Sequence, residues 1–155
     1  MAGSRKSKQI KQRKIPGETS IVQKGNPSQY YSQPPAWTFA NSDQDMWAFS
    51  KEHIGELIWT EILPRLKALE TQSWSEILVK NKKQNHSLNL NDLNKIAQDR
   101  LISKFIEAQS LISLRITGNH RLYGYMTGNV FNILWYDDTH GDNKNCVCRS
   151  RLKHT

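Results

Sequence analysis

Two arginines, two tyrosines and a histidine lie close together in the second half of the chain, and their types suit chemistry on a phosphate. They are Arg115, Arg121, Tyr123, Tyr125 and His140. Guanidinium groups donate paired hydrogen bonds to phosphate oxygens, and phenol rings offer flat surfaces on which bases stack. A histidine can give or take a proton near neutral pH. These residues therefore predict a surface that binds a nucleic-acid strand and acts on its backbone.

Three short runs rich in β-branched and aromatic residues carry most of these side chains. Two glycine-containing turn sequences separate the runs, which span residues 113–117, 121–126 and 129–136. We predict three antiparallel strands. Because side chains alternate between the two faces of a strand, Arg121, Tyr123 and Tyr125 share one face of the sheet. The third run is apolar on both faces, so we expect it to be a central strand.

Helical patterns precede these strands. Apolar residues at three- and four-residue spacing predict a helix over about 43–70, which Pro64 should split or kink because proline removes a backbone donor. Ser73 and Glu76 match a capping box, in which each side chain binds the backbone amide of the other residue. The capping box predicts a short helix that extends to about residue 79.

A polar stretch and one more helix complete the region before the sheet. Residues 81–89 are expected to form a loop, and for His86 within it we favour a solvated position over contact with RNA. Asn89 or Asn91 is expected to cap a helix over about 92–108. Several helices followed by a small antiparallel sheet predict an α+β fold.

The length and composition predict one folded domain with a tail. The chain has 155 residues, of which 37% are hydrophobic. Residues 1–33 lack apolar periodicity, and we expect a disordered basic tail. We expect residues 34–155 to form a single α+β domain, with helices at about 43–108 and the sheet at about 112–150. Since no apolar run approaches the ~20 residues that span a bilayer, we expect a cytoplasmic protein without a membrane partner.

The positive charge of the chain is concentrated at its two ends. The formal net charge is +8, with +6 in residues 1–24, +4 in residues 144–155 and −2 between them. RNA or a ribosome is a natural partner for such ends, although basic tails that serve only solubility are the other interpretation. The residues that we expect to bind RNA are His120, Tyr123, Tyr125, Arg149, Arg151 and Lys153.

Two cysteines near the C-terminus allow a metal site to be considered. Cys146 and Cys148 are flanked by His140 and His154, and thiolates and imidazoles are the usual ligands of zinc. The spacing of the two cysteines lacks the usual CxxC loop, and the sequence holds no second cysteine pair. We therefore expect buried free thiols, without a metal ion or another cofactor.

The order of these residues resembles the C-terminal half of the RelE/YoeB-like toxins, small bacterial ribonucleases that cut messenger RNA, usually on the ribosome. The similarity runs from Arg115-Ile116 through His120-Arg121-Leu122-Tyr123 and a hydrophobic strand to His140. It implies a RelE-like fold, in which helices cover one face of the sheet and the other face binds RNA. It also implies that Arg115 and Arg121 stabilise the scissile phosphate, that His140 is the catalytic histidine, and that an acidic antitoxin protein is a partner. In the closest members a tyrosine follows the histidine, whereas Gly141 follows here.

The resulting functional hypothesis is a toxin-like endoribonuclease that cleaves messenger RNA by metal-independent attack of the 2′-hydroxyl, with Arg115, Arg121 and His140 as catalytic residues. Two alternatives use the same surface without catalysis. One is a module that binds RNA or the ribosome, and the other is a domain that docks an acidic protein. The sequence leaves open whether the helices ahead of the sheet cover the face assigned to RNA.

Overall fold

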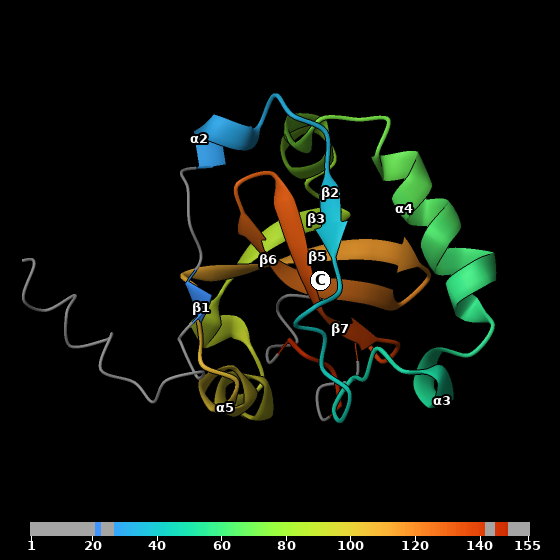
Figure 1. The fold of residues 1–155 in the computed structure, drawn as a ribbon, viewed down its shortest axis with the longest axis vertical. Coiled ribbons are helices and arrows are strands. Elements are labelled where there is room, and N and C mark those ends of the chain that lie inside the picture. The colour runs from blue at the N-terminus through green and yellow to red at the C-terminus, as the bar shows by residue number, and fades with distance from the viewer. Residues whose placement is uncertain (1–20, 23–26, 142–144, 149–155) are drawn as a thin grey trace, which may run out of the picture.

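A five-stranded sheet forms the centre of the molecule (Figure 1). The computed structural model describes residues 21–22, 27–141 and 145–148. In spatial order the strands are β2 (Ala36–Thr38), β7 (Val130–Asp137), β6 (His120–Thr127), β5 (Ser110–Thr117) and β3 (Asn85–Asn89). β2 runs parallel to β7, and all other neighbours are antiparallel. The predicted α+β class with a small, mostly antiparallel sheet is thus confirmed.

The three predicted strands are present as β5, β6 and β7; β5 and β6 are longer than expected, and β7 has the expected length but begins one residue later. Their turns contain Gly118 and Gly128, which have φ angles of 51° and 63°. These are left-handed conformations that glycine adopts without steric cost. β7 lies between β2 and β6, which confirms the central position predicted from its two apolar faces.

Helical segments cover one face of the sheet, and Pro64 shapes them. A π-helical turn, η1 (Ile58–Ile62), passes directly into α4 (Leu63–Leu69). The amide of Leu63 donates to the carbonyl of Ile58, one residue further back than in an α-helix, immediately before the proline that interrupts the ladder. The predicted helix over 43–70 is further divided, because α3 (Lys51–Ile54) ends at Gly55 with a φ angle of 56°.

The capping box is confirmed. The amide of Ser73 donates to the Glu76 carboxylate at 2.8 Å, and the amide of Glu76 donates to the Ser73 hydroxyl at 3.2 Å. It opens a helical turn, η2 (Glu76–Lys80). The buried Trp74 lies inside the box and donates from its indole nitrogen to the Asn129 carbonyl at 2.8 Å. The box therefore positions a tryptophan that fastens η2 to the turn between β6 and β7.

The polar stretch predicted as a loop contains a strand instead. β3 pairs antiparallel with β5 and places Asn85 opposite Leu114. The Asn85 side chain is buried, where it accepts from the Arg115 amide at 3.0 Å and donates to the Ile77 carbonyl at 3.4 Å. The prediction was wrong because an edge strand can be polar when its buried polar side chain finds backbone partners.

The helix predicted over 92–108 is shorter at both ends. A 3₁₀ turn, η3 (Leu90–Asp92), precedes α5 (Lys95–Ser103), and Asn94 is the cap, accepting from the Ile96 amide at 2.8 Å. After α5 the chain turns at Phe105, whose φ angle is 59°. It then forms β4 (Ile106–Glu107), which pairs in parallel with β1 (Ile21–Val22). The predicted cap, Asn89 or Asn91, was wrong because asparagine is a favoured cap residue at all three positions.

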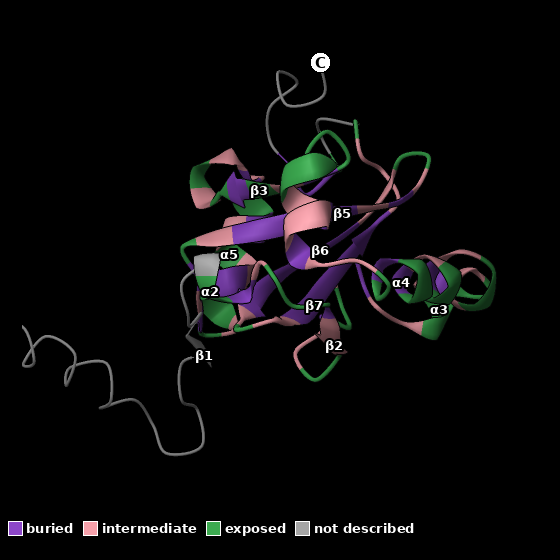
Figure 2. Ribbon diagram, turned by 90° about the horizontal axis from the view of Figure 1, so that it is seen from above, coloured by how far each residue is buried: buried purple, intermediate pink, exposed green. Residues whose placement is uncertain are grey.

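The sheet has a hydrophobic core on each face, and its strands are mostly buried (Figure 2). On one face Ile112, Leu114 and Leu122 pack against Leu66 and Leu69 of α4. On the other face the largest buried side chains include Tyr123, Tyr125 and Trp135, which pack with Leu93, Ala97 and Leu101 of the α5 region and with residues 146–148. Both faces of the sheet are therefore covered over much of their area.

The region expected to be a disordered tail contributes to the first core. α2 (Pro27–Tyr30) carries Tyr30, which is buried and meets Trp74 edge to face. Residues 1–20 and 23–26 of that region lie outside the described residues. None of the helices in the described part of the chain is long and apolar enough to cross a bilayer.

Candidate functional site

The two arginines singled out from the sequence are direct neighbours. Arg115 of β5 lies opposite Arg121 of β6, and Asp137 of β7 lies on the other side of Arg121. Directly opposite residues of adjacent strands project from the same face of a sheet. The structure therefore brings the two guanidinium groups together at the end of the sheet where the β5–β6 turn lies.

Both arginines occupy a partly buried position rich in positive charge. The Arg121 guanidinium donates to the carbonyls of Gly118 and His120 at 2.7 and 3.1 Å. Burial lowers the pKa of Arg121 and the charge of Arg115 lowers it further, whereas Tyr123, Cys148 and Asp137 act in the opposite direction. Within the described ranges, no carboxylate forms an ion pair with Arg115 or Arg121. An anion that entered this position would relieve the repulsion between the two cations.

A third arginine joins them from the opposite layer. Arg65 of α4 reaches the edge of β5, where its Nε donates to the Arg115 carbonyl at 2.9 Å. Burial and the neighbouring Arg115 charge lower the pKa of Arg65. Arg65 was not among the predicted site residues, because an arginine on a helix with no motif around it looks like an ordinary surface cation.

His140 lies on the same face of the sheet as Arg121. Its Nδ1 is 3.5 Å from the Tyr123 hydroxyl and 3.7 Å from the sulfur of Cys148. The His140 amide donates to the Asn119 carbonyl at 3.2 Å, which fixes the residue beside the β5–β6 turn. The predicted catalytic residues Arg115, Arg121 and His140 thus come from three segments that meet at one end of the sheet.

A second imidazole completes the group. His86 of β3 lies opposite Ser113, and Ser113 lies opposite Tyr123, so these three residues form one row across the sheet. Burial lowers the pKa of His86; the charge of Cys148 opposes that shift, while His140 and Arg121 reinforce it. The prediction that His86 lies in a solvated loop was wrong, and a predicted strand at β3 would have placed it here. We call Arg65, His86, Arg115, Arg121 and His140 the basic cluster.

The two cysteines lie against the basic cluster, buried and not joined in a disulfide, as expected. The Cys146 thiol donates to the Cys148 carbonyl at 2.9 Å, and Cys148 lies 2.8 Å from the Tyr123 hydroxyl. Hydrogen bonding from Cys146 holds the pKa of Cys148 well below its usual range against the effect of burial, and His140 and Tyr123 add to the shift. Among the described residues, no three His, Cys, Asp or Glu side chains are grouped to hold a metal ion.

The tyrosines occupy a different position from the one predicted. Tyr123 and Tyr125 are fully buried, and the Tyr125 hydroxyl accepts from the Asn41 amide group at 3.0 Å. The sheet face expected to be open is covered by α5 and by residues 145–148, so neither ring offers a surface to a base. A buried tyrosine and a surface tyrosine give the same alternating pattern in a strand, which is why the sequence did not separate them.

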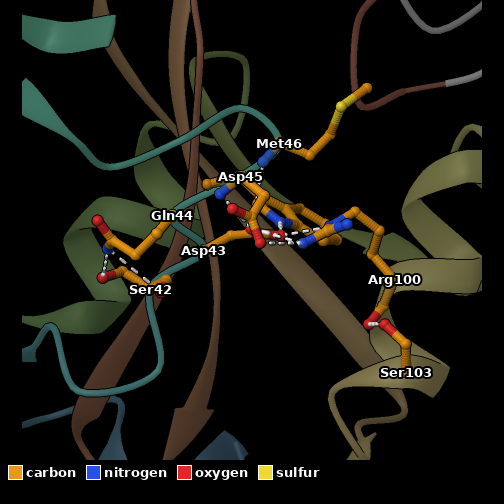
Figure 3. A network of polar contacts seen from close by, with 8 residues as sticks. Ser42, Asp43, Gln44, Asp45, Met46, Arg100 and Ser103 are labelled. Atoms are coloured by element: carbon orange, nitrogen blue, oxygen red, sulfur yellow. Dashed lines mark hydrogen bonds and ion pairs between the residues drawn. The ribbon is translucent and has the colours of Figure 1, made fainter. Parts of the chain in front are cut away.

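A charged network holds α5 against the sheet (Figure 3). Arg100 of α5 donates from Nε and Nη2 to the carboxylate of the fully buried Asp43, at 2.6 and 2.8 Å. The Trp135 indole of β7 donates to the same carboxylate at 2.9 Å. Burial alone would raise the pKa of Asp43, but these hydrogen bonds and two from backbone amides lower it to about 2. Asp43 therefore links α5 to the central strand.

Of the remaining residues predicted to bind RNA, the structure describes only His120, and it does not bring His120 to the basic cluster. His120 lies on the opposite face of β6 from Arg121, and its ring is hydrogen-bonded to the Tyr136 hydroxyl. Arg149, Arg151 and Lys153 lie outside the described residues.

No protein-family model, curated protein or solved structure with which the chain was compared matches it. Its function therefore has to be inferred from the arrangement of these side chains.

Proposed function

We propose that the protein is a toxin-like endoribonuclease that cleaves messenger RNA by attack of a 2′-hydroxyl on the adjacent phosphate. One observation carries the proposal: Arg115 and Arg121 are side by side, lack a carboxylate ion pair among the described residues, and lie close to two imidazoles. Guanidinium pairs of this kind suit the charge that develops on a phosphate during the reaction. The RelE-like character of the fold belongs to the same proposal.

Each role follows from where the group lies in the basic cluster, and for His86 also from its burial. His86, whose burial favours the neutral imidazole, takes the proton of the 2′-hydroxyl as the new bond from that oxygen to phosphorus forms. The bond from phosphorus to the 5′-oxygen breaks, and protonated His140 gives its proton to that oxygen. Arg115 and Arg121 bind the phosphate oxygens that carry the extra charge in between. The products are a 2′,3′-cyclic phosphate and a free 5′-hydroxyl, and the scheme requires no metal ion.

The RNA strand would approach the end of the sheet where the β5–β6 turn lies, and not the middle of the sheet. Arg115, Arg121 and His140 are half-buried, whereas Tyr123 and Tyr125 are fully enclosed. In this arrangement Tyr123 contributes by holding His140 and Cys148 in position, and stacking of bases on the sheet is not part of the proposal. RNA on the ribosome is the proposed substrate, the basic ends of the chain would add contacts to phosphates, and an acidic antitoxin would cover the same cluster.

The test is cleavage of a translated messenger RNA, with and without ribosomes. Arg121→Ala and His140→Ala should each reduce cleavage by about 10²-fold or more, because each removes a group that acts in the transition state. Lys95→Ala is the matched control, since Lys95 is an exposed cation on α5 whose side chain pairs only with Asp99 within the described residues. Circular dichroism and thermal unfolding establish that the variants fold.

Three outcomes are informative. Cuts that disappear in both site variants and persist in the Lys95 variant support the nuclease. Wild-type protein that binds RNA in a salt-dependent way without cutting it would replace the nuclease by an RNA-binding module. Indifference to RNA would point to a domain that docks an acidic protein.

A further inference from the structure

A polar hollow adjoins the basic cluster at the edge of β5. Its volume is about 250 Å³, and it is lined by Arg65, Gln84, Arg115, Ile116, Thr117 and Gly118. β3 begins at Asn85, opposite Leu114, and none of the strands formed by the described residues pairs with the edge of β5 beyond that point. The hollow is smaller than the sites that enclose drug-sized ligands, and its size suits a small polar group.

The chemistry of the lining favours an anion. Two of the six residues are arginines, one has an amide side chain and one a hydroxyl, and none is acidic. Arg65 lines the hollow and uses its Nε for the Arg115 carbonyl, so this bond does not occupy the two terminal nitrogens of its guanidinium. In the part of the chain that the structure describes, no carboxylate forms an ion pair with Arg65 or Arg115. Planar guanidinium groups bind phosphate through two parallel hydrogen bonds.

We propose that this hollow binds a phosphate group of the RNA backbone, held by Arg65 and Arg115 with help from Thr117 and Gln84. The assignment to RNA rests on the proposed nuclease function, whereas the preference for a phosphate does not. Arg115 stands between the hollow and Arg121, so the hollow would hold a phosphate next to the scissile one. Arg65 thus becomes a positioning residue that sets the path of the strand across the basic cluster.

The first arm of the test uses inorganic phosphate at constant ionic strength, followed by amide chemical shifts in NMR spectra. Wild-type protein should show saturable shifts at Thr117 and Gly118, and Arg65→Ala should weaken binding about tenfold, as expected for a charge-assisted hydrogen bond. Gln84→Glu should also weaken it, because the new carboxylate repels the anion while both arginines remain. Lys95→Ala should bind phosphate like the wild type. Shifts that avoid the hollow, or that saturate in Arg65→Ala at the same phosphate concentration as in the wild type, would overturn the proposal.

The second arm measures the affinity for a 2′-O-methyl RNA, which cannot be cleaved by 2′-hydroxyl attack. Arg65→Ala and Gln84→Glu should each reduce that affinity about tenfold. Unchanged RNA affinity together with lost phosphate binding would assign the hollow to a free phosphate anion and overturn its role in RNA binding. If wild-type protein cuts no RNA but both arms behave as expected, the nuclease fails and the hollow stands. If wild-type protein cuts RNA but the variants change neither phosphate binding nor RNA affinity, the nuclease stands and the proposal for the hollow fails.

Discussion

The Tyr123 hydroxyl lies 2.8 Å from the sulfur of Cys148, and this contact holds the C-terminal segment, residues 145–148, against the sheet. The same segment is fixed from a second strand, because the Val147 amide donates to the buried Asp137 carboxylate at 2.8 Å. His140 lies between these contacts, with Nδ1 near both the hydroxyl and the sulfur. The segment therefore both covers the aromatic part of the face and holds the histidine that the proposed reaction uses.

We expect Cys148 to be a thiolate at neutral pH and Cys146 a thiol. The pKa of Cys148 is lowered by hydrogen bonding from Cys146, and the pKa of Cys146 is raised by the same interaction. The ultraviolet absorbance of a thiolate should thus be present in the folded protein at pH values well below the ordinary cysteine pKa of about 8.5. Cys148→Ser should remove that absorbance, and Cys146→Ser should keep it because a hydroxyl can also donate. A wild-type protein without thiolate absorbance at pH 7 would contradict the expectation.

The Asp43–Arg100 pair should make stability depend on acid pH. Asp43 has a pKa of about 2 in the folded protein and of about 3.9 in an unfolded chain. A lowered pKa stabilises the fold above the unfolded value, and that contribution is lost as the pH falls from about 4 towards 2. Urea unfolding at a series of pH values should show the loss in the wild type.

Replacing the carboxylate tests the same pair directly. Asp43→Asn should cost about 3 kcal/mol of unfolding free energy, because it leaves a charged group without its partner. The value lies at the lower end of the usual range since the Arg100 side chain is 27% exposed. Asp45→Asn is the control: Asp45 also contacts Arg100, but its side chain is 84% exposed and should contribute little. Equal effects of the two substitutions would argue against a special role for the buried carboxylate.

Gly124 should tolerate no side chain. A Cβ atom there would clash with the Asn132 backbone carbonyl and would lie 2.7 Å from the Phe131 ring. We expect Gly124→Ala to lower the unfolding free energy by about 3 kcal/mol, because the backbone of β7 cannot move away without disturbing the sheet. Gly128→Ala is a useful comparison, since its Cβ meets nothing within 4 Å and only the left-handed backbone costs about 1 kcal/mol. Thermal unfolding distinguishes the two.

The strands were predictable where the local pattern and the tertiary environment agree. The runs that became β5, β6 and β7 have alternating apolar residues and glycine turns, and the capping box at Ser73 uses only local contacts. β3 escaped prediction because its buried Asn85 is stabilised by the backbone of Arg115 and Ile77, which are distant in sequence. A polar strand of this kind cannot be recognised without its partners.

The residues of the candidate site likewise divide into those that a local pattern predicts and those whose position depends on distant partners. Arg115 and Arg121 were identified from their alternation along neighbouring strands, and the cross-strand pairing brings them together. Arg65 and His86 were missed because their place beside the arginines depends on how α4 and β3 dock on β5. Burial of Tyr123 and Tyr125 also depends on docking, since α5 is held over them by the link from Arg100 to Asp43. Long-range packing, which the sequence pattern does not encode locally, decides each of these positions.

The pH dependence of cleavage offers a test of the second imidazole. If neutral His86 takes the proton of the 2′-hydroxyl, the rate should fall as the pH drops through its pKa, which burial places below the usual value of 6.5. His86→Ala should lower the rate by about 10²- to 10⁴-fold and remove this acidic limb of the profile. His86→Gln, which keeps a polar side chain of similar length in β3, separates the loss of a base from a loss of packing. A profile whose acidic limb survives in both folded variants would exclude His86 as the base and leave the arginines to act with another group.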